Sequence, residues 1–198
     1  EPPRRTNIDL AKDPWCLKNV KQLLRDDAVV DAQGRVANCC VFIELGMNKQ
    51  TFPAPQAPAR LVQKGCTYLP HVLPVRVGQE LEIEHADPGT SHNYKLTSRF
   101  QDPINKTQSN PGVNREFMQR PEVGAKFNCD VHPWMLCSMH VFTHDFYAVS
   151  TEDGAFEIKG VPPGRYRVAF NHERWKTPPI EVTIGAKETK DLGEIILK

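Results

Sequence analysis

The 198-residue chain carries 25 basic and 24 acidic residues, so its charge is nearly balanced. This balance gives no support for nucleic acid or an anionic membrane as the main partner. No apolar run approaches the length of a transmembrane segment, and no signal peptide is visible at the start. The length allows one large β domain or two small ones.

The first third of the chain predicts one helix and two strands. Apolar residues recur at helical spacing over 16–25, which predicts a short helix there. Residues 28–36 indicate a strand and a turn centred on Gly34, and a second strand follows through 40–43. The three prolines of 46–60 favour an extended linker over the surface.

The middle of the chain has the pattern of a β-sandwich. The runs 72–77 and 80–84 flank a turn at Gly78-Gln79, and the second run alternates charged and apolar residues. This alternation predicts that Leu81 and Ile83 face the core. Residues 97–126 are rich in Asn, Pro, Gly and Gln, which predicts a long excursion over the surface. Strands resume at 141–142 and 146–149.

The C-terminal part predicts further hairpins. Its apolar runs between 153 and 168 alternate with polar residues and are closed by Asp-Gly or Pro-Gly turns. We expect the last two strands at 180–184 and 192–197.

Three potential metal ligands lie close together in the segment Phe127-Asn128-Cys129-Asp130-Val131-His132-Pro133-Trp134-Met135. Two residues separate Cys129 from His132, and two separate His132 from Met135. A thiolate, an imidazole and a thioether form a soft donor set that suits copper. A fourth donor is available upstream in His92, which is followed by Asn93 and lies at a loop or at the start of a strand.

Two other interpretations of these residues remain open. Zinc prefers four Cys or His ligands and has no use for a thioether, so Met135 argues against a zinc site without excluding it. An inert cluster is the other alternative, because Met and free Cys residues are often simply buried in a core.

The two separated elements, a His-Asn pair and a Cys-x-x-His-Pro-aromatic-Met loop, resemble the cupredoxins, which are type 1 blue copper proteins. The loop is most similar to the short ligand loop of amicyanin and plastocyanin-like proteins. The resemblance implies a Greek-key β-sandwich with one type 1 copper held by His92, Cys129, His132 and Met135. It also implies that Asn93 hydrogen-bonds across to the Cys129 loop and that the edge of His132 approaches the surface.

The tail resembles the second half of a carboxypeptidase regulatory-like, or transthyretin-like, β module, and residues 28–45 resemble its first half. The expected fold is therefore all-β: a cupredoxin sandwich, a small additional β module and a short N-terminal helix. We expect an N-terminal segment over 1–60, a cupredoxin domain over 61–148 and a regulatory-like segment over 149–198. The whole arrangement is similar to exported bacterial cupredoxins, which implies a periplasmic or otherwise exported protein.

Six cysteines are present, and five remain if Cys129 binds metal. Five cysteines allow two disulfides and leave one thiol over, and this content suits an oxidising compartment. Loop-like surroundings favour a bond between Cys16 and Cys66. Cys39 and Cys40 should point to opposite faces of a strand, so one of them could meet Cys137. The sequence does not fix this pairing.

A second site is conceivable because Cys137 and His140 repeat the Cys-x-x-His spacing, with His144 nearby. A disulfide or a place in the core is the alternative for Cys137.

The donor set predicts an exported electron carrier that cycles between Cu(I) and Cu(II) and exchanges single electrons with a protein partner. Because all four ligand positions are filled, we expect no enzymatic activity. The alternatives are copper storage or delivery, a copper enzyme with a further catalytic copper, and a β scaffold with an incidental site. The sequence does not indicate the partner's identity or the oligomeric state.

Overall fold

The computed structural model describes residues 2–47 and 50–198. These residues form two compact units. The central unit comprises Arg4–Asp26 and Pro53–Thr143, and the flanking unit comprises Glu1–Pro3, Asp27–Phe52 and His144–Lys198. Among the described residues, no helix is long and apolar enough to cross a membrane.

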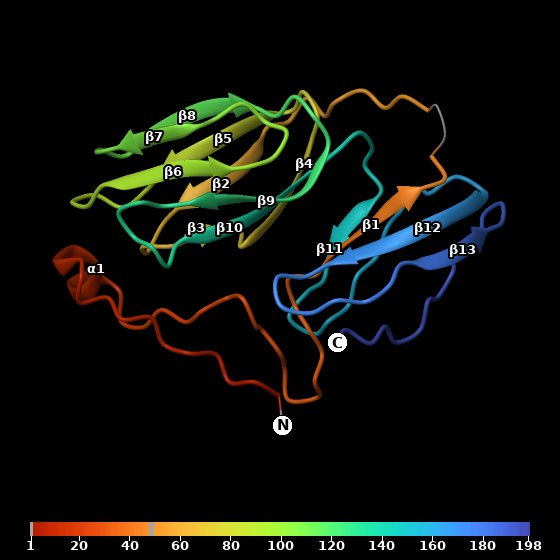
Figure 1. The fold of residues 1–198 in the computed structure, drawn as a ribbon, viewed down its shortest axis with the longest axis horizontal. Helices are drawn as coiled ribbons and strands as arrows, with labels where there is room; N and C mark the ends of the chain where they lie inside the picture. Colours follow the sequence, from red (N-terminus) through yellow and green to blue (C-terminus); the bar gives the residue numbers. More distant parts are fainter. Residues whose placement is uncertain (1, 48–49) are drawn as a thin grey trace. The chain divides into compact units, whose positions relative to one another are not determined.

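The central unit contains one helix and nine strands, which Figure 1 labels. In chain order they are α1 (Pro14–Asn19), β2 (Ala59–Gln63), β3 (Tyr68–Leu69), β4 (Val72–Arg76), β5 (Glu80–His85), β6 (His92–Thr97), β7 (Asn105–Gln108), β8 (Gly112–Phe117), β9 (Glu122–Asn128) and β10 (Leu136–Phe142). A five-stranded sheet has the order β4-β10-β9-β6-β7, and a four-stranded sheet has the order β3-β2-β5-β8. Two neighbouring pairs are parallel, β4 with β10 and β2 with β5, and the others are antiparallel.

One buried cluster joins the two sheets of the central unit. Leu61, Leu81 and Ile83 come from the four-stranded sheet, whereas Phe127 and Met139 come from the five-stranded sheet. In β5 the burial alternates residue by residue, as expected for a strand with one face in the core. The prediction that Leu81 and Ile83 face inward is thereby confirmed, and this part of the chain is a β-sandwich.

In the described residues of the flanking unit, one four-stranded sheet is present, with the order β11-β1-β12-β13. Its strands are β1 (Cys40–Leu45), β11 (Tyr147–Val149), β12 (Gly164–Asn171) and β13 (Ile180–Ile184). Strand β1 pairs antiparallel with both β11 and β12, so residues from opposite ends of the chain share one sheet.

The N-terminal helix is shorter than the predicted range of 16–25. Helix α1 begins at Pro14, with the Asp13 side chain accepting a hydrogen bond from the Cys16 backbone N–H, and it ends before Val20, whose backbone is extended. The later apolar residues of the predicted helix lie on extended chain, where Leu24 forms a bridge with Asn7. The spacing of the apolar residues therefore predicted a helix beyond residue 19 that the structure does not contain.

The segment 97–126, predicted to be a long excursion over the surface, is mostly exposed in β7 and β8 but forms regular strands. This segment supplies β7, β8 and the start of β9. Strands β7 and β8 are the edge strands of their sheets, and polar side chains are common on edge strands because they discourage pairing with other chains.

Two other predicted strand regions are smaller than expected. Around Gly34, whose φ is 83°, the strand pair is reduced to a single bridge between Val30 and Val36. Residues 192–197 form no strand, although Leu192 and Leu197 pack against the core of the flanking unit.

Candidate metal centre

Three of the four residues singled out by the sequence meet in the central unit. His92 is the first residue of β6, Cys129 directly follows β9, and His132 lies in the loop that leads to β10. One donor atom from each side chain lies within 4.8 Å of the other two. All three residues are buried, and both histidines have no exposed surface.

The spacing of these atoms allows them to share one ion. The Nδ1 atoms of His92 and His132 are 3.1 Å apart, and Cys129 Sγ is 3.9 Å from His132 Nδ1. A first-row metal ion such as zinc lies about 2.0 Å from a ring nitrogen and about 2.3 Å from a thiolate sulfur. Both separations are smaller than the sums of these bond lengths, and the remaining separation, between His92 and Cys129, is within 4.8 Å, so the three donors are close enough to bind one ion.

Cys129 lies in surroundings that favour its thiolate form. Its sulfur accepts hydrogen bonds from the backbone N–H groups of Asn93 at 3.4 Å and His132 at 3.3 Å. Burial acts to raise the pKa of this thiol, but the hydrogen bonds from His132 and the neighbouring backbone outweigh it and lower the pKa. The thiolate is the form of cysteine that binds metal.

Asn93 connects the two segments that carry the donors. Its Oδ1 accepts a hydrogen bond from the Asp130 backbone N–H at 3.2 Å, and its Nδ2 donates to Asn105 Oδ1 at 2.7 Å. The hydroxyl of Tyr68 donates to the Asn93 backbone carbonyl at 2.5 Å and lies 3.2 Å from the carbonyl of Asn128. The expectation that Asn93 bridges to the Cys129 loop is confirmed.

Each histidine of the centre is held by a carboxylate that the sequence analysis did not identify. His92 Nε2 lies 2.9 Å from Asp87 Oδ2, and His132 Nε2 lies 2.9 Å from Asp13 Oδ2. In both cases the contact occupies the ring nitrogen opposite the one that faces the centre. Carboxylates in this position fix the orientation of a metal-binding imidazole and raise its basicity.

Both carboxylates are themselves fixed by hydrogen bonds. Asp13 accepts from the Cys16 backbone N–H at 2.9 Å and from Thr90 Oγ1 at 2.8 Å. Burial acts to raise the pKa of Asp13, but the hydrogen bonds from Cys16, His132 and Thr90 lower the pKa to about 2. Asp87 accepts from the backbone N–H groups of Gly65 and Cys66, and these bonds together with His92 overcome burial and lower its pKa.

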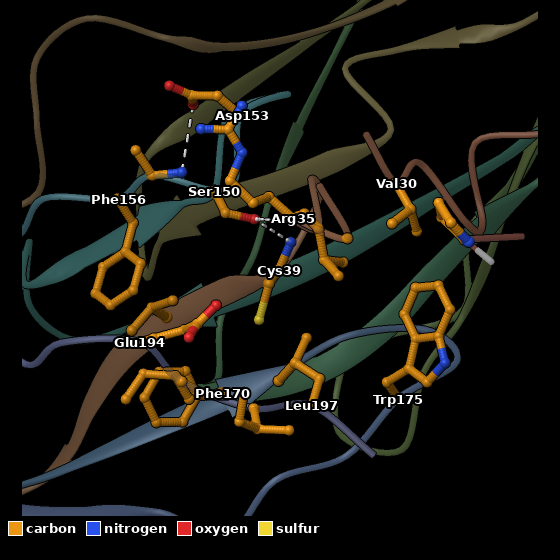
Figure 2. Close-up of a pocket in the computed structure, with 18 of the residues that line it drawn as sticks. Val30, Arg35, Cys39, Ser150, Asp153, Phe156, Phe170, Trp175, Glu194 and Leu197 are labelled. Carbon is orange, nitrogen blue, oxygen red and sulfur yellow. Dashed lines mark hydrogen bonds between the residues drawn. The ribbon is translucent and has the colours of Figure 1, made fainter. Parts of the chain in front are cut away.

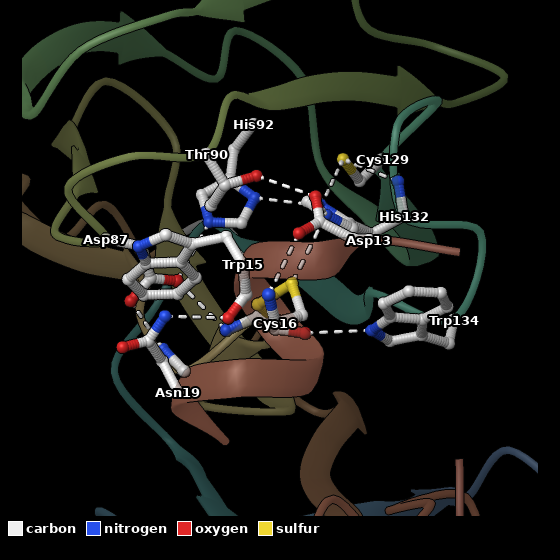
Figure 3. Close-up of a disulfide and its surroundings, with 12 residues drawn as sticks. Asp13, Trp15, Cys16, Asn19, Asp87, Thr90, His92, Cys129, His132 and Trp134 are labelled. Atoms are coloured by element: carbon white, nitrogen blue, oxygen red, sulfur yellow. Dashed lines mark hydrogen bonds and ion pairs between the residues drawn. A yellow bond between two sulfur atoms is a disulfide. The ribbon is translucent and has the colours of Figure 1, made fainter. Parts of the chain in front are cut away.

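The outer edge of His132 contacts Asp13 and Cys16, which belong to residues 4–26, and we call this segment the N-terminal cap. Cys16 of this cap forms a disulfide with Cys66, as predicted, and Cys16 Sγ lies 3.4 Å from His132 Nε2. Trp134 packs on the other side, with its ring centroid 5.1 Å from that of His132 and its Nε1 donating to the Cys66 carbonyl. Figure 3 shows this enclosure. The expectation that the His132 edge approaches the surface is therefore wrong.

Met135 belongs to the same buried cluster as Cys129. It is fully buried, and its backbone N–H donates to the His132 carbonyl at 2.9 Å, which closes the turn of the loop. This position agrees equally with a thioether that faces the centre and with a residue that only packs.

The remaining cysteines and histidines do not form another cluster among the described residues. Cys39, Cys40 and Cys137 are buried free thiols, so the disulfide to Cys137 that the sequence left open is not formed. The groups that could hold a metal ion in the described chain are His92–Cys129–His132 and Cys16–Cys66–His132, and neither includes His140 or His144.

A cavity of about 470 Å³ in the flanking unit has a different character (Figure 2). Its walls include the apolar side chains of Val41, Phe156 and Phe170. The cysteine on its wall is Cys39, and burial raises the pKa of this thiol to about 11. The thiol is therefore protonated near neutral pH, and this cavity is not a second thiolate centre.

No family model and no curated protein matches the sequence. Several solved structures are similar to part of the chain. A purple cupredoxin from Nitrosopumilus maritimus shares 19% identity over 42% of this chain and 99% of its own, with a TM-score of 0.36. A mutant of amicyanin in its reduced Cu(I) form shares 13% identity over 52% of this chain and 98% of its own, with a TM-score of 0.39. A copper-containing nitrite reductase from Thermus scotoductus shares 18% identity over 47% of this chain and 25% of its own, with a TM-score of 0.41.

Proposed function

We propose that this chain is a copper protein that carries single electrons at one type 1 site, with His92, Cys129, His132 and Met135 as ligands. The observation that carries the proposal is the gathering of two imidazole nitrogens and one low-pKa thiol in a buried pocket of the central unit. Copper bound there would supply reversible one-electron chemistry, because two imidazoles and a thiolate with a weak axial thioether suit both of its oxidation states.

The surrounding hydrogen bonds support this proposal because they hold the donors before any ion binds. The backbone N–H groups of Asn93 and His132 fix the sulfur of Cys129, and Asp87 and Asp13 fix the two rings. Donors that are fixed in this way change position little when the charge at the centre changes. A small rearrangement is what rapid electron transfer requires of the protein.

The two carboxylates also bear on the balance between oxidation states. Their negative charge lies on the far side of each imidazole and increases the electron density on the nitrogen that faces the centre. We therefore propose that Asp13 and Asp87 favour the more highly charged state of the ion and lower the reduction potential.

We further propose that the protein works in the periplasm or another exported location, where the Cys16–Cys66 disulfide would persist. Its partner in this proposal is a redox protein. We keep as proposals the cupredoxin domain over 61–148 and the relationship of the sequence around it to a carboxypeptidase regulatory-like module.

Copper storage or delivery is a second candidate, and one observation favours it. His132 has no exposed surface and is enclosed by Asp13, Cys16 and Trp134. A covered imidazole edge slows electron exchange with a partner, whereas it protects a stored ion. This candidate uses the same donors but binds Cu(I) without a useful Cu(II) state.

The test is a Cu(II) titration of the full chain, followed by visible absorption and electron paramagnetic resonance. We expect one equivalent to give an intense thiolate-to-copper band with narrow hyperfine splitting. Cys129→Ser should lose the band, and Cys137→Ser, which changes a buried free thiol of the next strand, should keep it. A wild-type protein without the band, or a band that survives Cys129→Ser, would contradict the proposal.

Voltammetry of the copper-loaded protein separates the two candidates. A reversible one-electron wave supports the electron carrier. A protein that binds Cu(I) tightly and gives no stable Cu(II) form supports storage or delivery.

A further inference from the structure

A second group of potential ligands lies against the outer edge of His132. The sulfur atoms of Cys16 and Cys66 and one ring nitrogen of His132 lie within 4.8 Å of one another, and all three residues have no exposed surface. Asp13 Oδ2 is 2.9 Å from His132 Nε2. In the oxidised protein the two sulfur atoms are joined to each other and cannot bind a metal ion.

The two cysteines are held in place by contacts other than their disulfide. The Cys16 backbone N–H donates to Asp13 Oδ1 at 2.9 Å. The Cys66 backbone N–H donates to Asp87 Oδ2 at 2.9 Å, and its carbonyl accepts from Trp134 Nε1 at 2.9 Å. These bonds do not depend on the S–S bond. Reduction therefore leaves two thiols facing the same imidazole edge, in a pocket whose backbone is already fixed.

We propose that reduction of the Cys16–Cys66 disulfide creates a second metal site, which we call the outer site, for a soft closed-shell ion, Cu(I) or Zn(II). Its ligands are Cys16 Sγ, Cys66 Sγ and His132 Nε2. Two thiolates and one imidazole are three of the four ligands of a known kind of tetrahedral Zn(II) site, and thiolates also select Cu(I). The proposal goes beyond the electron-carrier function, because it uses the opposite edge of His132 and needs no ion beside Cys129.

The chemistry of this step balances with a thiol reductant. A dithiol reductant supplies two electrons and two protons, so that the S–S bond is replaced by two S–H groups and the reductant becomes a disulfide. Binding of the ion then releases both thiol protons to solvent. When the ion beside Cys129 is absent, the neutral His132 ring carries its proton on Nδ1 and offers Nε2. If both sites were filled, His132 would use both ring nitrogens as ligands and its ring proton would also be released to solvent.

The experiment compares metal binding by the oxidised and reduced full-length chain. The protein is reduced with dithiothreitol, desalted without oxygen and titrated with Zn(II) or Cu(I) against a chromophoric chelator. A His92→Ala/Cys129→Ser variant removes two donors of the first site, formed by His92, Cys129 and His132. It leaves the outer site intact. We expect this variant to bind one ion after reduction and none before it, and the separate Zn(II) and Cu(I) titrations show which ion is preferred.

Cys16→Ser/Cys66→Ser in the same background is the matched variant, and it should bind no ion in either state. Co(II) provides a spectroscopic readout, because thiolate charge-transfer and tetrahedral ligand-field bands should appear only when both cysteines are present and reduced. The proposal is overturned if the reduced His92→Ala/Cys129→Ser protein binds no ion, or if its ion is retained after both outer cysteines are replaced.

A second measurement covers the case in which the serine variants do not fold. In the reduced wild-type protein, a bound ion should protect Cys16 and Cys66 from alkylation, as read by peptide mass mapping. Equal alkylation of the two residues with and without the ion would overturn the proposal. Failure of the electron-carrier proposal has a different readout: the oxidised wild-type protein, titrated with Cu(II), would lack the intense thiolate-to-copper band.

Discussion

The hairpin formed by β9 and β10 presents the same Cys-x-x-His spacing twice, with opposite results. In the loop, Cys129 and His132 face each other, with Sγ and Nδ1 3.9 Å apart. In β10, Cys137 packs into the core between the two sheets, whereas His140 is not part of that core cluster and its Nε2 lies 3.3 Å from Ser138 Oγ. The comparison teaches that the spacing alone does not create a metal site.

Backbone conformation explains the difference. Along a strand, successive side chains point to opposite faces, so residues three apart lie on different faces. Cys137, Met139 and Val141 accordingly share the core face of β10. The loop at 129–135 turns, closed by the bond from the Met135 N–H to the His132 carbonyl, and brings its two donors to one side.

The electrostatic surroundings of the two thiols differ in the same way. Both are buried, but burial dominates at Cys137 and raises its pKa far above that of an ordinary thiol. At Cys129 the hydrogen bonds from His132 and the loop backbone overcome burial and lower the pKa. Only the loop cysteine is therefore prepared to act as a thiolate.

The largest expected effect is on copper affinity, when the histidine of each Cys-x-x-His spacing is replaced in a separate variant. His132→Gln should weaken copper binding by about a hundredfold or more, because loss of a direct ligand should cost at least as much as loss of a residue that supports one. His140→Gln should leave the affinity unchanged. Competition with a chelator of known affinity measures both values. Equal losses in the two variants would remove the distinction between loop and strand.

The second prediction concerns the pH dependence of stability at His140. Burial lowers the pKa of this residue from 6.5 to about 4. Between these values the unfolded chain binds a proton that the folded chain does not bind, so stability is fully present above pH 6.5 and decreases as the pH falls. We expect a loss of about 2 to 3 kcal/mol between pH 7.5 and 4.5.

Urea unfolding at several pH values tests this expectation, with His140→Gln as the comparison. The difference in unfolding free energy between wild type and variant isolates the contribution of this residue from those of other titrating groups. A difference that stays constant from pH 7.5 to 4.5 would contradict the prediction.

A smaller effect is expected from the carboxylates that support the loop site. Asp13→Asn and Asp87→Asn should each lower copper affinity by about tenfold to a hundredfold, the range found for residues that orient metal ligands. Each change should also raise the reduction potential, because a negative charge behind an imidazole is removed. Chelator competition and voltammetry provide the two readouts. An unchanged potential in both variants would show that the carboxylates only position the rings.

The smallest effect is expected for the exposed charge in the same loop. Asp130 and Lys95 form an ion pair at 3.3 Å, and each side chain is about half exposed. Surface pairs of this kind contribute about 0 to 1 kcal/mol. Asp130→Ala should therefore leave the absorption spectrum unchanged and alter thermal stability only slightly. A large change in the spectrum would mean that the loop depends on this pair.

The sequence predicted those parts of the structure that depend on local patterns. The alternation in 80–84 identified the core-facing residues, and the spacing of Cys129 and His132 indicated the donors that the structure brings together. The sequence did not predict the edge strands β7 and β8, because their residues are mostly polar and exposed and give no alternating apolar pattern. What makes them strands is pairing with β6 and β5.

The covering of His132 could not be predicted from local patterns. Asp13 lies 119 positions before the histidine that it contacts. In the sequence, Asp13 followed by Pro14 signals only the start of a helix. The N-terminal cap covers His132 because of tertiary contacts: Thr90 donates a hydrogen bond to Asp13, and Cys16 lies against the His132 ring.

The Cys16–Cys66 bond also determines which fragments a protease can release. The two cysteines belong to the central unit and are separated by 50 residues, and β1 of the flanking unit lies between them in the chain. A single cut in the proline-containing linker at 50–58 falls inside this covalent ring. The nicked protein should therefore run as one band on a non-reducing gel and separate into two only after reduction.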